Sequence, residues 1–259
     1  MSGLAFALCS ICLCTSHYDP HNIRCVRRRL SWTGWQFRYA RFLLSWKHQP
    51  APSPFLDYET KTNLFLPFHG EWHVAWGGRS FGRNRHSIVS DQRFAYDFLQ
   101  LERGWSFRAD GERNEDFICF GQPIYAPASA VVVSTCDGVP DNIPGEIDAK
   151  NPLGNYVVLD HGNGEFSFLA HFQIGTVMVR PHAEVEAGDL VGRCGNSGNS
   201  SESHLHFHLQ NTPEPFIGMG LPAFFCDYLL GGKRVPRGEP VGGQTISRLL
   251  PHGRQSFPL

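Results

Sequence analysis

The segment HLHFHL, residues 204–209, has a histidine at every second position and an apolar residue after each histidine. Side chains of a β-strand point alternately to its two faces. The pattern therefore predicts a strand with His204, His206 and His208 on one face and a packed core on the other. Neighbouring histidines on that face would lie about 6–7 Å apart, close enough for two of them to serve one small site. Thr, Lys or Glu would suit an ordinary polar strand face equally well, so the three histidines favour a functional site.

Short strands separated by turns are predicted through most of the chain. The stretch GNYVVLDHGNGEFSFLAHF, residues 154–172, has two alternating segments on either side of Gly162-Asn163-Gly164. These turn residues tolerate positive φ, so the stretch is typical of a β-hairpin. Further strands are expected within residues 63–68, 71–78, 95–101 and 122–136, and no amphipathic helix is evident between residues 55 and 210. We therefore predict a mainly β fold with antiparallel sheets and long loops.

Composition changes near both ends of the chain and suggests three parts. Residues 1–52 form a basic N-terminal extension, residues 53–230 a β-rich domain, and residues 231–259 a loose tail rich in Gly, Pro and Arg. Residues 3–14 resemble the apolar core of a signal peptide, but they lack preceding basic residues and a clear cleavage site. Residues 27–46 mix Arg with Trp, Phe and Leu. That composition suits peripheral contact with an anionic membrane. A poorly ordered leader, or sequence upstream of the true start, is the favoured interpretation.

Charge and hydropathy argue against two classes of protein. The net charge of −1 argues against nucleic acid as the main partner. No run reaches the roughly 18 apolar residues that a membrane-spanning helix needs, so no transmembrane helix is predicted. Four widely spaced cysteines follow the N-terminal extension, and their spacing fits buried thiols as well as one or two disulfides. They are Cys119, Cys136, Cys194 and Cys226.

Candidate metal ligands are distributed over the β-rich domain. The stretch RHSIVSDQRFAYDF contains His86, Asp91 and Asp97, and LAHF contains His171. Asp97 follows a tyrosine and precedes a phenylalanine, and a carboxylate in such an apolar strand needs a partner to offset its desolvation. A catalytic zinc site uses three ligands of these residue types and leaves one position for water.

The segment HGEWH, residues 69–73, is a weaker metal candidate. It spaces two histidines four residues apart, as the helical zinc-protease motif does. That motif has Glu directly after the first histidine, whereas this chain has Gly70, and the Trp and Gly residues around it disfavour a helix.

The segments GQPIYAPASAVV, DHGNG, AHF and GNSGNSSESHLHF, in this order between residues 121 and 207, resemble the lysostaphin/LytM-type zinc endopeptidases. These enzymes cut the peptides of peptidoglycan. The resemblance covers about half of the chain and implies the duplicated hybrid motif fold, an antiparallel β-sheet or sandwich. It also implies one Zn²⁺ per chain, with His206 as a ligand and with His171 and His204 lining the site to orient water or stabilise the oxyanion.

The chain departs from the family pattern at the other two ligands. They usually come from an HxxxD motif, but Arg93 occupies the position four before Asp97 and cannot bind zinc. The nearest histidine is His86, eleven residues upstream of Asp97. We infer an inserted loop that lets His86 and Asp97 meet. The pair of His86 with Asp91 is a weaker alternative, because only Asp97 has the DF context of the family. His208 has no counterpart role.

The resemblance implies a zinc metalloendopeptidase that hydrolyses stem peptides or cross-bridges of peptidoglycan. Such a hydrolase would act outside the cytoplasm, in the periplasm, in the cell wall or as a secreted protein. The unusual His86–Asp97 spacing keeps an alternative open, namely a catalytically inactive cell-wall-binding or regulatory module on the same fold. A phosphocarrier with two facing histidines and no metal is a further alternative. Asp97 argues against it, because a carboxylate beside the histidines would repel phosphate.

Overall fold

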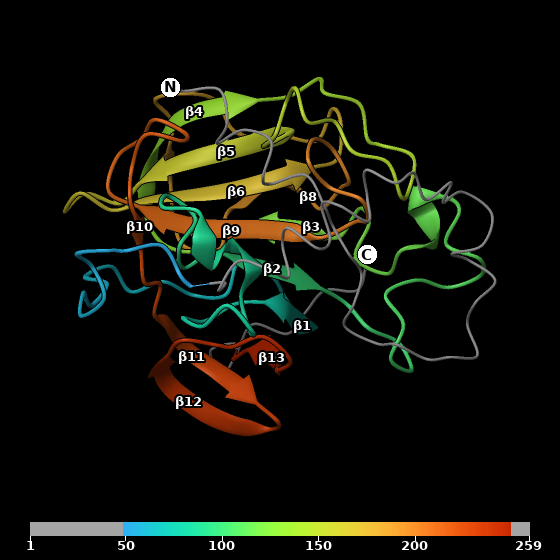
Figure 1. The fold of residues 1–259 in the computed structure, drawn as a ribbon. Coiled ribbons are helices and arrows are strands. Elements are labelled where there is room, and N and C mark those ends of the chain that lie inside the picture. Colours follow the sequence, from blue (N-terminus) through green and yellow to red (C-terminus); the bar gives the residue numbers. More distant parts are fainter. Residues whose placement is uncertain (1–48, 250–259) are drawn as a thin grey trace.

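The computed structural model describes residues 49–249, so the predicted extension at residues 1–52 lies almost wholly outside the described residues. The signal-like segment and residues 27–46 also lie outside them. Thirteen strands make up most of the regular structure (Figure 1). They are β1 (Glu71–Trp76), β2 (Tyr96–Leu99), β3 (Pro123–Tyr125), β4 (Ala130–Cys136), β5 (Asn155–Asp160), β6 (Phe166–Phe172), β7 (Glu184–Val185), β8 (Leu190–Arg193), β9 (Leu205–Gln210), β10 (Gly220–Leu221), β11 (Phe225–Leu230), β12 (Lys233–Gly238) and β13 (Thr245–Arg248). In the described part of the chain, the helices are two short 3-10 turns, η1 (Arg85–Ile88) and η2 (Asn114–Asp116).

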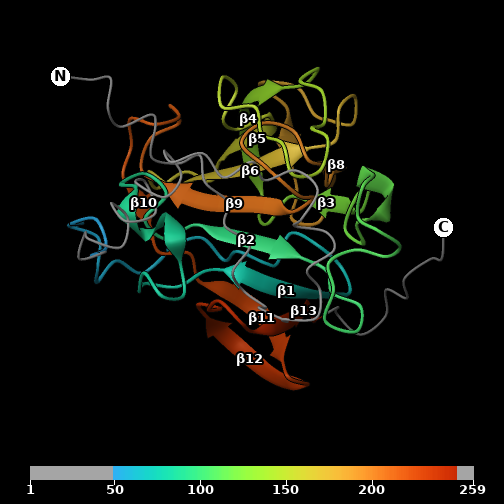
Figure 2. The same ribbon diagram turned by 45° about the vertical axis from the view of Figure 1, so that its right-hand side comes forward.

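One 11-stranded sheet dominates the structure, as both ribbon views show (Figures 1 and 2). Its strand order is β12-β11-β13-β1-β2-β9-β6-β5-β4-β7, with β10 paired to β9. The neighbours in this order run antiparallel, and β3 and β8 form a separate antiparallel pair. The predicted mainly β, antiparallel fold class is confirmed. Strands β2, β9 and β6 lie side by side near the middle of the sheet.

The expected strand at residues 204–209 and the expected hairpin are both present. In β9, Leu205, Phe207 and Leu209 are buried in the hydrophobic core, while the intervening histidines lie on the opposite face. Strands β5 and β6 form the hairpin, and Asn163 in its turn has a φ of 56°. Residues 63–68 differ from the expected strand. Leu64, Leu66 and Phe68 are buried, but the only strand-type pairing in this stretch is a single bridge between Leu64 and Phe225.

Residues 231–249 differ from the loose tail predicted at residues 231–259, and the last ten residues of that prediction lie outside the described residues. Gly231 and Gly232 form the turn between β11 and β12, and β13 pairs with both β11 and β1. Ile246 of β13 lies in the hydrophobic core. Strand β12 is at the edge of the sheet, where Pro236 and basic side chains are tolerated because one side needs no partner strand. An edge strand of this composition resembles a tail in sequence.

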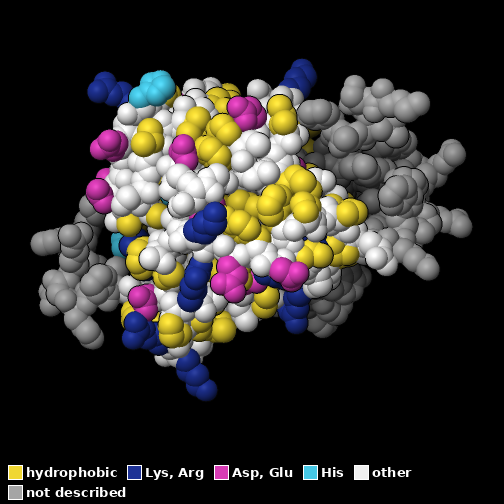
Figure 3. Space-filling view, turned by 90° about the vertical axis from the view of Figure 1, so that its left-hand side faces the viewer, with side chains coloured by type: hydrophobic (Ala, Val, Ile, Leu, Met, Phe, Trp, Pro, Cys, Tyr) yellow, Lys and Arg dark blue, Asp and Glu magenta, His cyan; other side chains and the backbone are white. Residues whose placement is uncertain are grey.

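The structure also bears on the predicted absence of a membrane-spanning helix, on the cysteines and on the distribution of surface charge. No helix among them is long and apolar enough to cross a membrane. Cys119, Cys136, Cys194 and Cys226 are free thiols, and Cys119 and Cys194 are buried. On the face shown in Figure 3, basic and acidic side chains are interspersed around apolar ones rather than gathered by sign.

Candidate metal centre

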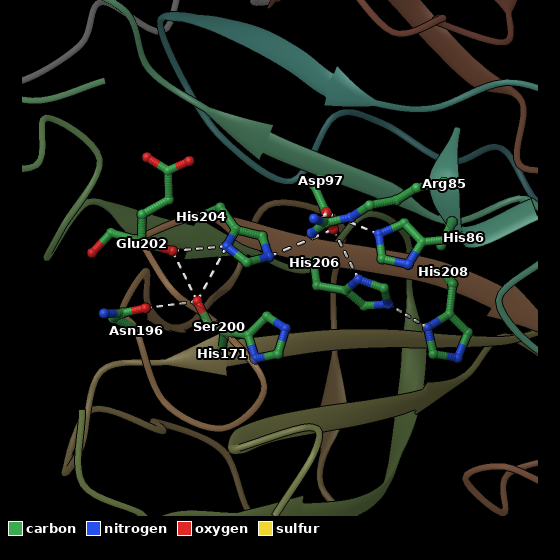
Figure 4. Close-up of polar contacts among 12 residues, drawn as sticks. Arg85, His86, Asp97, His171, Asn196, Ser200, Glu202, His204, His206 and His208 are labelled. Carbon is green, nitrogen blue, oxygen red and sulfur yellow. Dashed lines mark hydrogen bonds and ion pairs between the residues drawn. The ribbon is translucent and has the colours of Figure 1, made fainter. Parts of the chain in front are cut away.

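Three neighbouring strands bring the predicted site residues to one face of the sheet. Asp97 in β2 lies directly opposite His206 in β9, and His206 lies opposite Ala170 in β6. His171 follows Ala170, so strand register places the Asp97 carboxylate and two imidazoles in one small region. Figure 4 shows these side chains together with those of His86, His204 and His208.

His86 reaches this region from η1, outside the sheet. Its Nε2 is 2.8 Å from the Asp97 Oδ2, although eleven residues separate the two positions. Asn84 holds the intervening loop closed. Its side-chain oxygen accepts from the His86 backbone N–H at 3.0 Å, and its amide nitrogen donates to the Ala95 carbonyl at 3.1 Å. One buried side chain therefore joins the two ends of the loop that brings His86 to Asp97.

His86, Asp97 and His206 form a group that could hold a metal ion. One ligand atom from each residue lies within 4.8 Å of the others. The three residues are 8%, 2% and 3% exposed, respectively. Two imidazoles and one carboxylate are a donor set that suits zinc. Asp91, the alternative partner of His86, is also buried but is not part of this group.

The electrostatics of the group favour the protonation states that a metal requires. Burial alone would raise the pKa of the Asp97 carboxyl, but nearby His86 and His204 and the hydrogen bonds from His206 and His86 hold it well below its usual value. Burial also lowers the pKa of His206 to about 4, against the influence of Asp97. At neutral pH the carboxylate is therefore ionised and His206 is neutral, as metal ligands must be.

His171 and His204 lie beside the group, and carbonyl groups orient their rings. The His171 Nδ1 donates to the Ser197 carbonyl at 2.8 Å, and the His204 Nδ1 donates to the Glu202 carbonyl at 2.9 Å. The Nε2 of His204 lies 3.5 Å from the Asp97 Oδ1. Burial, together with the neighbouring imidazoles of His204 and His206, lowers the pKa of His171 well below its usual value. Both residues thus present Nε2 as the ring nitrogen not bonded to a carbonyl.

His171 occupies an irregular position in β6. Its φ is 66°, and the register of β5 against β6 shifts there, so it is the extra residue of a β-bulge. Bulges commonly redirect side chains beside functional sites. The two ring centroids of His171 and His204 are 4.8 Å apart.

Two residues next to His86 contribute to the site and were not predicted. Asn84, described above, closes the loop. The Arg85 Nη2 donates to the Asp97 Oδ2 at 3.1 Å, and its guanidinium lies over the ring of Trp76 at 5.4 Å. An Asn directly before a short helical turn is a recognisable capping signal, so Asn84 was accessible to sequence reasoning. The Arg85 contact depends on the folded loop and has no comparable signal.

Comparison with known proteins identifies the family. Residues 113–216 match the model of peptidase family M23. The chain is 31% identical over 90 residues to a protein named Lipoprotein NlpD from Yersinia enterocolitica, covering 35% of this chain and 78% of that protein. The chain belongs to peptidase family M23. The family match includes His171 and the histidines of β9 but begins after Asp97.

The relatives within family M23 carry two kinds of name. The Peptidoglycan DD-endopeptidase ShyA of Vibrio cholerae is 33% identical over 90 residues, which are 34% of this chain and 17% of that protein. The Murein hydrolase activator NlpD of Salmonella dublin is 29% identical over 111 residues, 41% of this chain and 28% of the relative. The chain thus spans less than a third of the length of these two relatives.

Solved structures of M23 proteins include distant neighbours of the chain. The catalytic domain of lysostaphin from Staphylococcus simulans has 19% sequence identity and a TM-score of 0.35, over 59% of this chain and 88% of the domain.

Proposed function

We propose that this M23 protein is a zinc-dependent endopeptidase that hydrolyses peptide bonds of peptidoglycan. The observation that carries the proposal is the convergence of His86, Asp97 and His206 within 4.8 Å of one another. The departure from the family's HxxxD spacing was the main argument against an intact ligand set, and the closed loop at Asn84 supports an intact one. A zinc ion bound there would acidify a water molecule and polarise the scissile carbonyl.

The chain's own groups support hydrolysis in two ways. At neutral pH Asp97 is ionised and His206 is neutral. Both residues are therefore already in the protonation state that binds a metal. His171 and His204 are each fixed through Nδ1 by a carbonyl. Their Nε2 atoms can therefore take a proton from water, donate to the developing oxyanion, or return a proton to the leaving amine.

Peptidoglycan peptides are the proposed substrate because one relative is named as a peptidoglycan DD-endopeptidase. Another relative is named as a lipoprotein. Both names support a site of action outside the cytoplasm, where peptidoglycan lies.

A second candidate function is regulation of another cell-wall enzyme without hydrolysis. The names of the murein hydrolase activators favour it. The buried ligand group argues for hydrolysis instead, because an inactive module has no need to keep two imidazoles and a carboxylate desolvated together.

Zinc content and peptidoglycan cleavage, measured on the same preparation, test the proposal. We expect about one zinc per chain by mass spectrometry and release of peptide fragments from purified peptidoglycan. His206→Ala should lose both. His69→Ala changes an exposed histidine outside the site and should retain both, which controls for nonspecific loss of imidazole. A wild-type chain that binds zinc but leaves peptidoglycan intact would favour the regulatory function.

A further inference from the structure

The polar face of β9 continues beyond the proposed metal ligands. His206, His208 and Gln210 occupy alternate positions and are all buried. His208 and Gln210 are not among the groups that the proposed hydrolysis uses. Burying two such polar side chains is unfavourable unless they form hydrogen bonds.

His208 contacts the proposed ligand His206 directly. The His206 Nε2 lies 3.0 Å from the His208 Nδ1 (Figure 4). The His208 ring also stacks on Phe168, with centroids 4.5 Å apart and planes 11° apart. This packing fixes the plane of the His208 ring, so its Nδ1 faces His206 in a defined orientation.

The hydrogen bonds of Gln210 determine which atoms donate and which accept along His206, His208 and Gln210. Its Nε2 donates to the Thr212 carbonyl at 2.7 Å and to the Glu214 carbonyl at 2.8 Å, which uses both amide protons. Its Oε1 is therefore the end of the amide that remains, and it can only accept. Gln210 Oε1 and His208 Nε2 are both buried, belong to successive side chains of one strand face and interact with each other; neither has another hydrogen-bond partner among the described residues.

We propose that His208 is a positioning residue for the metal-bound state: when a metal replaces the hydrogen bond between the His206 Nδ1 and Asp97, His208 accepts a hydrogen bond from the His206 Nε2–H and so leaves the Nδ1 lone pair to the metal. An acceptor at Gln210 favours a proton on the His208 Nε2. The His208 Nδ1 then has a lone pair and accepts from the His206 Nε2–H. The remaining His206 nitrogen, Nδ1, is the one that faces Asp97 at 2.9 Å. This inference rests on the proposed function, in which His206 is a zinc ligand.

A purely structural role does not account for these observations. A phenylalanine would stack on Phe168 and fill the same space without burying two ring nitrogens. Partners that orient ligating histidines through their second nitrogen are a general feature of metal sites, and their loss typically weakens metal binding by about 10–100-fold.

Zinc affinity, measured by competition with a chelator, tests the role of His208. His208→Phe should weaken zinc binding by about 10–100-fold. His208→Asn places its Oδ1 near the original Nδ1 and should rescue affinity to within about threefold of wild type, because the acceptor is restored. His208→Gln is the matched control: it carries the same amide one carbon further out, and it should bind zinc as weakly as the Phe variant. It also serves if the Phe variant does not fold.

The outcomes distinguish failure of the positioning role of His208 from failure of the proposed zinc site. Wild type that binds zinc, with unchanged affinity in the Phe and Gln variants, would overturn the positioning role alone. Equal weakening in the Asn and Gln variants would also overturn it, because position of the acceptor would then not matter. A wild-type chain without zinc would overturn the proposed function and the positioning role together.

Discussion

Asp97 and Glu165 are two buried carboxylates with opposite kinds of surroundings. Asp97 is contacted by His86, His206 and Arg85, whose side chains come from two separate parts of the chain. Glu165, in the turn between β5 and β6, is contacted by one segment. The Tyr58 hydroxyl donates to it at 2.7 Å, and the backbone N–H groups of residues 61 and 62 donate at 2.6 and 2.9 Å.

The two carboxylates differ in whether the groups that hydrogen-bond to them can bind a metal ion instead. Backbone N–H groups and hydroxyls keep their protons, so Glu165 is a permanent anchor for residues 58–62. A neutral imidazole has one nitrogen lone pair that can bind a metal instead. The two imidazole partners of Asp97, His86 and His206, can therefore be rearranged around an ion, whereas the partners of Glu165 cannot. The comparison teaches that burial of a carboxylate does not by itself indicate a functional site; the chemistry of its partners does.

The largest expected effect is loss of the metal in Asp97→Asn. The amide keeps the shape of the side chain but removes the charge that a bound cation needs, so zinc content and peptidoglycan cleavage should fall to background. Glu165→Gln makes the same chemical change at the other carboxylate and should keep about one zinc per chain. Mass spectrometry of both purified variants checks this, and zinc loss in the Gln variant would break the distinction between them.

His204→Ala tests whether His204, which lies beside Asp97, is a metal ligand or an acid–base group. His204 lies 3.5 Å from Asp97 but outside the ligand group, so the variant should keep zinc. Its cleavage rate should fall by about 10²–10⁴-fold, the usual contribution of a positioned acid–base group. His171→Ala should behave in the same way. Zinc analysis beside a cleavage assay measures both quantities, and metal loss in His204→Ala would instead make His204 a ligand.

Glu165→Gln should affect stability rather than chemistry. The variant replaces an ionised acceptor of several hydrogen bonds by a neutral amide, one of whose ends must face donors. We expect the free energy of unfolding to fall by about 2–3 kcal/mol. Urea denaturation measures this value, and Tyr58→Phe, which removes one of the donors, should give a smaller loss of about 1 kcal/mol. A change below that of Tyr58→Phe would show that Glu165 is not the anchor.

The smallest expected effect is a pH dependence of that stability difference. Burial raises the pKa of Glu165, but hydrogen bonds from Thr62, Lys61 and Tyr58 outweigh it and leave the pKa below its ordinary value. A carboxyl with a lowered folded pKa stabilises the protein fully above its unfolded pKa, about 4.3, and this contribution is lost as the pH falls through the folded pKa. The difference between wild type and Glu165→Gln should therefore be constant near neutral pH and shrink in acid. Urea denaturation across this range would reveal a constant difference if the sign were wrong.

The sequence predicted the strands with the simplest local patterns. The alternation of β9 and the glycine turn between β5 and β6 are local, and both predictions were confirmed. The C-terminal strands were missed, because β12 is a basic edge strand with a proline and its pairing partners lie elsewhere in the chain.

The site was accessible to sequence reasoning only in part. Strand alternation placed the β9 histidines on one face, whereas the meeting of His86 with Asp97 depends on the closure of a loop by Asn84. Family resemblance supplied the candidate ligands but gave no role to His208. Its contact with His206 and its stacking on Phe168 combine two strands, and no pattern within a single strand contains that information.

The bulge at His171 changes the face of the sheet to which the side chains at the end of β6 point. Phe168 and Ala170 lie opposite His208 and His206, and Leu169 points into the main core. Unbroken alternation would send Phe172 to the metal side and bury His171 in the core. The extra residue shifts the count by one, so His171 reaches the site and Phe172 joins the core. Inserting or deleting one residue in this strand would exchange the two side chains. The presence of the His171 imidazole in the site thus depends on the number of residues in the strand as much as on the residue being histidine.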